Sequence, residues 1–145
     1  MKDPARFIRQ KIITALSGNI TYDGSAVPVY GTVPSTTGFP YIRVYGVNTV
    51  EVDQNRSSFT TEVTTRIEAV SRFITDDGGE LTTNSLISDC LNLLRVRSGN
   101  YVNLSGDGFK VYTSVIGNIN YLREDTKNNT YYRAILELEN RVLEL

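Results

Sequence analysis

The strongest constraint on this chain is a long alternation of apolar and polar residues between positions 59 and 73. Successive side chains of a β-strand point to opposite faces of a sheet, so a period of two predicts a strand. One face of this strand would be half-buried and the other would stay wet. The odd positions are mainly apolar (Phe59, Val63, Ile67, Ala69 and Phe73), whereas the even positions include Thr60, Glu62, Thr64, Arg66, Glu68 and Arg72.

A second alternating stretch precedes this one and runs from Tyr41 to Val52. A polar turn at residues 53–58 separates the two stretches, so we expect them to form an antiparallel hairpin. The alternation places Ile42, Val44, Val50 and Val52 on one face, and Tyr41, Arg43, Tyr45 and Val47 on the other.

The last third of the chain predicts a second long hairpin. A strong turn at residues 105–108 precedes its first arm, and a charged, turn-forming tip at residues 123–129 separates the two arms. Apolar residues alternate in both arms: Phe109, Val111, Val115 and Ile119 in the first, and Tyr132, Ala134, Leu136, Leu138 and Val142 in the second.

Two other segments have the period of an amphipathic helix. In the first, Asp3 is a suitable N-cap, Pro4 fits the first helical position, and Gly18 ends the helix. A second helix is expected at residues 81–95. The apolar stripes are Phe7, Ile8, Ile12, Ala15 and Leu16 in the first helix, and Leu86, Ile87, Cys90, Leu91 and Leu94 in the second.

These elements, with short strands expected at residues 27–30 and 100–104, follow the order α-β-β-β-α-β-β. The sequence therefore predicts an α+β fold, a mostly antiparallel β-sheet with two long hairpins and two helices packed on one face. The 145 residues show neither an internal repeat nor a linker, so we expect a single domain over residues 1–145.

The composition argues against catalysis. The chain contains no histidine, and its one cysteine, Cys90, lies in an apolar run and is expected to be buried. No nucleophile motif or phosphate-binding loop occurs, and the acidic run at residues 76–80 is best explained as a turn before a helix. Glu137 and Glu139 share a strand face with arginines, which favours ion pairs. We therefore expect no enzyme activity, no cofactor and no metal site.

Charge and hydropathy argue against two further kinds of partner. A net charge of -1 gives no general attraction to nucleic acid. No segment approaches the roughly 20 apolar residues of a membrane helix, and the charged N-terminus does not have the pattern of a secretory signal. The unusual residue is tyrosine, with nine copies and no tryptophan, and tyrosine suits both strand packing and protein interfaces.

A series of short motifs follows the whole chain in a familiar order. A Val-Pro loop at residues 29–34 (VYGTVP) leads to residues 39–44 (FPYIRV), where Phe-Pro-Tyr enters a strand. A polar strand and a helix follow, and a hairpin with a charged tip, residues 121–125 (YLRED) and 131–136 (YYRAIL), ends the chain. In this order the chain resembles the tail terminator (tail completion, neck) proteins of tailed bacteriophages, although its first loop, residues 22–37, is longer.

The resemblance implies a structural protein of the virion, made in the cytoplasm of the bacterial host and placed at the head–tail junction. Such proteins form a ring, commonly of six copies and alternatively of twelve, that caps the tail tube. The ring docks to the connector or adaptor below the capsid and lets DNA pass without sequence-specific binding. A closed ring requires head-to-tail contacts between copies of the chain.

We expect three regions to supply those contacts: the first long loop, one face of the first long strand and the tip of the last hairpin. The alternatives are another neck, connector or tail-fibre-attachment subunit, or a carbohydrate-binding module, although sugar sites often use tryptophan. The candidate interface residues are Thr32, Val33, Pro34, Phe39, Tyr41, Arg43, Tyr45, Arg123, Glu124, Asp125, Lys127, Asn128 and Asn129.

Overall fold

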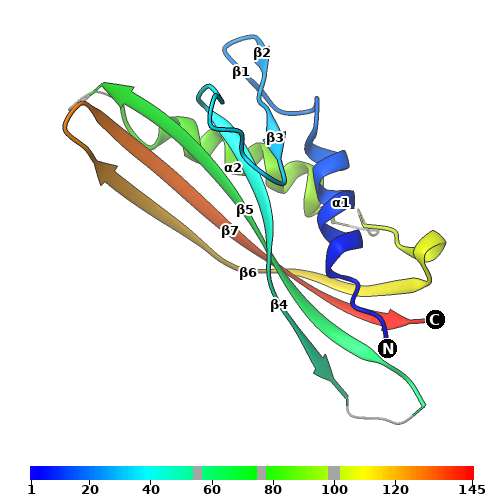
Figure 1. The fold of residues 1–145 in the computed structure, drawn as a ribbon. Coiled ribbons are helices and arrows are strands. Elements are labelled where there is room, and N and C mark those ends of the chain that lie inside the picture. Colours follow the sequence, from blue (N-terminus) through cyan, green and yellow to red (C-terminus); the bar gives the residue numbers. More distant parts are fainter. Residues whose placement is uncertain (54–56, 75–77, 98–101) are drawn as a thin grey trace.

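The computed structural model describes residues 1–53, 57–74, 78–97 and 102–145. Within these ranges the chain has an α+β fold with two α-helices and mostly β-strands (Figure 1). The helices are α1 (Ala5–Leu16) and α2 (Leu81–Leu94), and a 3₁₀ turn, η1, covers Ser105–Asp107. The strands are β1 (Thr21–Tyr22), β2 (Ser25–Ala26), β3 (Val29–Tyr30), β4 (Tyr41–Val52), β5 (Thr60–Ile74), β6 (Phe109–Asp125) and β7 (Asn129–Glu144).

The main sheet has the strand order β3-β4-β5-β7-β6. Strands β4, β5, β7 and β6 pair antiparallel, whereas β3 pairs parallel to β4, so the sheet is mixed. The small β1–β2 hairpin forms a second sheet that the predicted order α-β-β-β-α-β-β did not contain. The strand expected at residues 27–30 shortens to β3, Val29–Tyr30, although the Pro28 carbonyl accepts a hydrogen bond from the Ile42 N–H at 2.9 Å. Residues 102–104 are not in a strand, and Asn100 and Tyr101 lie outside the described residues.

Both helices lie on the same side of the main sheet (Figure 1). Their apolar stripes and the inward-facing strand residues form one buried cluster, in which Ile8 and Ile12 of α1 meet residues such as Ile42 and Ile67. The predicted start of α1 is one residue too early: the N-cap is Pro4, which makes no side-chain capping bond, and the helix begins at Ala5. Asp3 precedes the cap, and its Oδ1 accepts a hydrogen bond from the Ala5 N–H at 3.0 Å. Gly18 follows the helix with a positive φ of 77°, a conformation that favours glycine.

The face predicted for the second half of β4 is wrong, and a β-bulge is the reason. Val44 stands opposite the buried Ile67, but the register shifts between Gly46 and Asn48. After the bulge it is Thr49 that stands opposite the buried Val63. Val50 therefore faces the side of the sheet that carries no helix, which we call the open side. Val52, opposite Thr60, faces the same side.

Strand β6 contains two register shifts, and they overturn one of its four predicted core positions. Val111 faces the core opposite Val142, but after the first shift Val115 pairs with the outward Glu139 and is exposed. Ile116 takes the inward position in its place. The second shift lies between Ile116 and Ile119 and returns Ile119 to the core side, opposite Leu136.

The even face of β5 is not wet along its whole length, as the alternation predicted. Thr60 at its start and Glu68 and Val70 in its middle are buried, and the exposed positions, Arg72 and Ile74, lie near its C-terminal end. The strand also starts at Thr60, so Phe59 precedes it and is 36% exposed. Asp76 and Asp77 of the predicted acidic turn lie outside the described residues. Among the residues that the structure describes, no helix is long and apolar enough to cross a membrane.

Candidate assembly surfaces

The loop before β4 and the first residues of β4 form an aromatic cluster on the open side of the sheet. We define this cluster as Tyr30, Phe39, Tyr41, Arg72 and Tyr131. The Phe39 ring lies 5.3 Å from that of Tyr41 and 5.8 Å from that of Tyr131, and Tyr30 lies 6.3 Å from Tyr41. The Arg72 guanidinium sits over the Phe39 ring at 4.5 Å, at a distance suited to a cation–π interaction. The cluster thus connects two predicted contact residues, Phe39 and Tyr41, with side chains from β3, β5 and β7.

Next to this cluster, one buried carboxylate holds two arginines from the flanking strands. Glu68 on β5 is 3% exposed. Its Oε2 accepts a hydrogen bond from Arg43 of β4 at 2.9 Å, and its Oε1 accepts one from Arg133 of β7 at 2.6 Å. Tyr45 adds a longer contact from its hydroxyl at 3.5 Å, and the Arg43 guanidinium covers the Tyr45 ring. We call this group the Glu68 clamp, and it contains the other two predicted strand-face residues.

The clamp changes the proton affinity of its arginines. Burial by itself lowers the pKa of Arg133, but its hydrogen bond and charge interaction with Glu68 outweigh that cost, so the pKa is raised. The pKa of Arg43 is raised for the same balance of causes. Both guanidinium groups therefore stay charged near neutral pH.

The tip of the β6–β7 hairpin connects to the clamp through one ion pair. Glu124 lies 3.6 Å from Arg133, and Arg123 pairs with Asp125 at 3.2 Å. Asp125 also accepts a hydrogen bond from Thr130, which closes the tip on itself. The other predicted tip residues, Lys127, Asn128 and Asn129, complete the turn, with Lys127 and Asn128 exposed and Asn129 half-buried.

The first part of the long loop lies elsewhere. Thr32 lines an open hollow of about 440 Å³ together with Arg6, Arg9 and Gln10 of α1, on the helix side. Pro34 is exposed and Val33 is half-buried. The structure thus brings Phe39, the strand face and the hairpin tip together along the open side of the sheet, and places Thr32 apart from them.

Sequence reasoning missed five members of this surface: Tyr30, Glu68, Arg72, Tyr131 and Arg133. The alternation assigns Glu68 to a wet face. Its partners Arg43 and Arg133 come from distant parts of the chain, so the sequence does not show that they cover it. Arg72 had no sequence signal that paired it with Phe39. Tyr131 carried a signal, since it belongs to the group of tyrosines in or beside strands.

The described residues offer little chemistry. They contain no group of three or more histidine, cysteine or acidic side chains that could hold a metal ion. Burial raises the pKa of the Cys90 thiol to about 12, so the thiol stays neutral and is a poor nucleophile near neutral pH. This environment suits a core residue.

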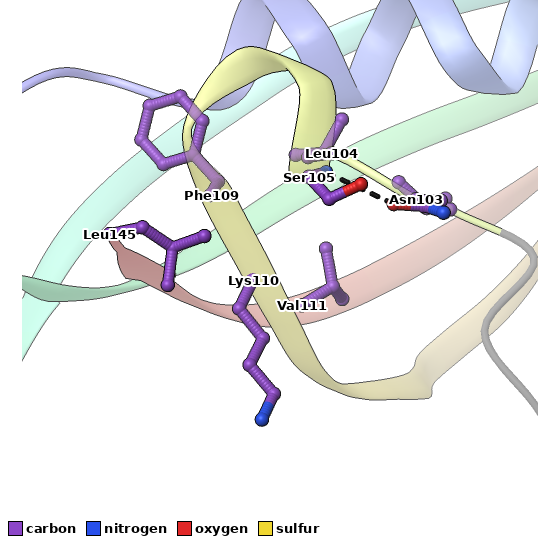
Figure 2. Close-up of a pocket in the computed structure, with 8 residues that line it drawn as sticks. Asn103, Leu104, Ser105, Phe109, Lys110, Val111 and Leu145 are labelled. Atoms are coloured by element: carbon purple, nitrogen blue, oxygen red, sulfur yellow. Dashed lines mark hydrogen bonds between the residues drawn. The ribbon is translucent and has the colours of Figure 1, made fainter.

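One open pocket of about 470 Å³ lies where β6 begins (Figure 2). Its walls are mainly apolar, from Leu104, Phe109, Val111 and the terminal Leu145. The Asn103 Oδ1 already accepts a hydrogen bond from the Ser105 N–H at 3.0 Å. The pocket is therefore a mainly apolar recess, with the charged side chain of Lys110 among its lining residues.

No family model matches the chain, and a search of the curated proteins finds no match either. The aromatic cluster, the Glu68 clamp and the hairpin tip place aromatic and charged groups side by side on the open side of one sheet.

Proposed function

We propose that this protein is a structural subunit of the bacteriophage head–tail junction, which forms a ring that caps the tail tube and docks it to the connector. The observation that carries the proposal is the continuous surface formed by the aromatic cluster, the Glu68 clamp and the hairpin tip. The motifs that resemble tail terminator proteins supply much of that surface. The ring, its six copies and its place in the virion are part of this proposal.

The chemistry of the surface suits contact with other proteins. Tyrosine and arginine are enriched at protein interfaces, because they combine a large contact area with polar groups that keep a partner. The two arginines of the clamp are balanced by Glu68 together with Glu124, which lies 3.6 Å from Arg133, so covering the group would leave no unpaired charge. A near-neutral chain also lacks a strong electrostatic hold on DNA phosphates, which suits a ring through which DNA passes.

Electron microscopy of the purified protein mixed with tail tubes of the phage that encodes it tests the proposal. We expect a ring seated at the end of each tube, and tubes that stop growing once capped. A variant with Phe39→Ala and Tyr41→Ala should lose end binding, whereas Tyr22→Ala, at an exposed tyrosine on the small β1–β2 hairpin, should retain it. Binding along the sides of tubes, or none at all, would contradict the proposal.

A carbohydrate-binding module is the competing function from a different class. Sugar stacking needs an open aromatic face, but Arg72 already lies over the Phe39 ring and Tyr131 lies against its edge. The aromatic cluster therefore favours protein contact over sugar stacking. Binding to a glycan array that is lost in the Phe39→Ala and Tyr41→Ala variant would support the carbohydrate function instead.

A further inference from the structure

Strand β6 forms one outer edge of the main sheet. It is 17 residues long, and in the described part of the chain β7 is its only strand neighbour. Roughly half of its backbone N–H and C=O groups therefore point away from the sheet. Proteins usually protect such an edge with bulges, charges or proline, because an open edge can pair with another strand.

The protection of β6 is uneven. Its first half has two register shifts, between Val111 and Thr113 and between Ile116 and Ile119, and these interrupt a straight ladder. From Ile119 onward the register with β7 is continuous to Asp125. Residues 119–122 (INYL) carry neither a charge nor a bulge, and Tyr121 and Leu122 are 44% and 50% exposed.

The opposite edge of the same sheet is also open. Strand β3 pairs only with Ile42 and Arg43, so within the described residues β4 has no neighbour on that side from Val44 to Val52. This part of β4 exposes Val47 and Val50, which are 41% and 52% accessible. The outward turn of Val50 is a consequence of the bulge between Gly46 and Asn48.

The exposed apolar side chains of the main sheet are concentrated on these two edges. Among the described residues, β4 contributes Val47 and Val50, and β6 contributes four large side chains (Tyr112, Val115, Tyr121 and Leu122). On the inner strands β5 and β7, only Ile74 at the end of β5 belongs to this group. One bulge interrupts β4, but among the described residues these stretches of β4 and β6 have no strand neighbour on their outer side. Exposed apolar residues on such edges favour pairing with a further strand.

We propose that the β6 edge of one copy, at residues 119–122, pairs with the β4 edge of the next copy, at residues 45–52. The occupant is a second copy because one chain presents two different open edges on opposite sides of a single sheet. Such a contact is head-to-tail, and it closes into a ring when the rotation between copies allows. The β6 segment also runs directly into the tip residues Arg123–Asp125, so edge and tip belong to one contact surface.

This inference rests on the proposed function only for the closure of the ring; the pairing itself follows from the two edges. It names the element that joins the copies, which leaves the aromatic cluster available for the tail tube or connector.

Two complementary variants test the pairing. The first blocks the β6 edge with Tyr121→Lys and Leu122→Lys, and the second blocks the β4 edge with Val47→Lys and Val50→Lys. Each blocked variant retains one open edge of the other kind. Lysine is a natural guard of edge strands, and burying its charge against a partner strand should weaken self-association roughly tenfold or more. The matched control, Leu81→Lys with Val96→Lys, adds two lysines at exposed sites flanking α2.

The expected result is that each blocked variant is monomeric alone and that the two together form a one-to-one heterodimer of about 32 kDa, twice the 16.2 kDa chain. The control should assemble like the natural chain. Native mass spectrometry with a small mass tag on one variant gives the composition, and circular dichroism of each variant checks its folding.

Three outcomes would overturn the inference. Both blocked variants could assemble like the natural chain, which would show that the copies associate through a surface other than the β4 and β6 edges. The variant with an open β6 edge could dimerise alone, which would indicate symmetric pairing of β6 with β6. The natural chain and the mixture could both stay monomeric. In contrast, a mixed heterodimer together with open filaments of the natural chain would retain the edge pairing and contradict the ring.

Discussion

Replacing Glu68 by glutamine removes the charge of the clamp while keeping its shape. Glu68 is buried at the centre of the open side of the sheet and accepts hydrogen bonds from Arg43 and Arg133. The neutral amide retains one oxygen for these bonds and turns an NH₂ group toward a guanidinium. Two positive charges would then lie close together without their shared partner.

The magnitude follows from the exposure of the partners. Hydrogen bonds to charged groups contribute about 1.5 to 3 kcal/mol each when they are well shielded. The Arg43 and Arg133 side chains are 41% and 30% exposed, so water compensates part of the loss and about 1 kcal/mol per bond remains. We therefore expect Glu68→Gln to lower the free energy of unfolding by about 2 kcal/mol.

Urea unfolding at fixed protein concentration measures this difference in free energy. In thermal unfolding, the melting temperature should fall by roughly 8 °C for a chain of this length. The matched control is Glu62→Gln on the same strand, because the Glu62 pair with Arg141 is long, at 3.8 Å, and exposed on both sides. It should cost about 0.5 kcal/mol or less. Equal effects of the two substitutions would refute the assignment of the clamp.

Two further predictions concern single side chains. Native Cys90 should react with a thiol reagent at pH 8 far more slowly than the unfolded chain, since burial keeps the thiol protonated with a pKa of about 12; rapid labelling of the folded protein would contradict its burial. Because that pKa is raised above the unfolded value, the Cys90 contribution to stability is complete below about pH 9 and is lost as pH rises toward 12, which urea unfolding at several pH values can measure. Phe39→Ala should destabilise the fold by about 2 kcal/mol through the loss of its contacts with Tyr41, Tyr131 and Arg72; an unchanged urea midpoint would show that the cluster does not support the fold.

The long strands could be predicted because a period of two is a local pattern. The alternation defined β4 with the bounds that the structure shows and placed the inward residues of β7 from Tyr132 to Val142 on the core side. The helices could be predicted for the same reason, since each apolar stripe repeats within a few turns, although α1 begins one residue later than its predicted cap implied. The α+β class follows from these elements together.

The faces of Val50, Val52 and Val115 could not be predicted from alternation, because one inserted residue in a strand reverses every side chain after it. Gly46 and Gly117 lie at two of the shifts, and a glycine within a strand pattern can signal a bulge. The pairing of Glu68 with Arg43 and Arg133 depends on which strands become neighbours. Strand order is a property of the whole chain, so the alternation of one strand could not reveal the clamp.

Native mass spectrometry of the natural chain over a range of concentrations tests the central claim most directly. We expect one closed assembly of fixed mass, about 97 kDa for six copies of the 16.2 kDa chain, in equilibrium with the monomer. A monomer at every concentration, or a broad ladder of masses without a dominant closed species, would contradict the assignment of this protein as a ring subunit.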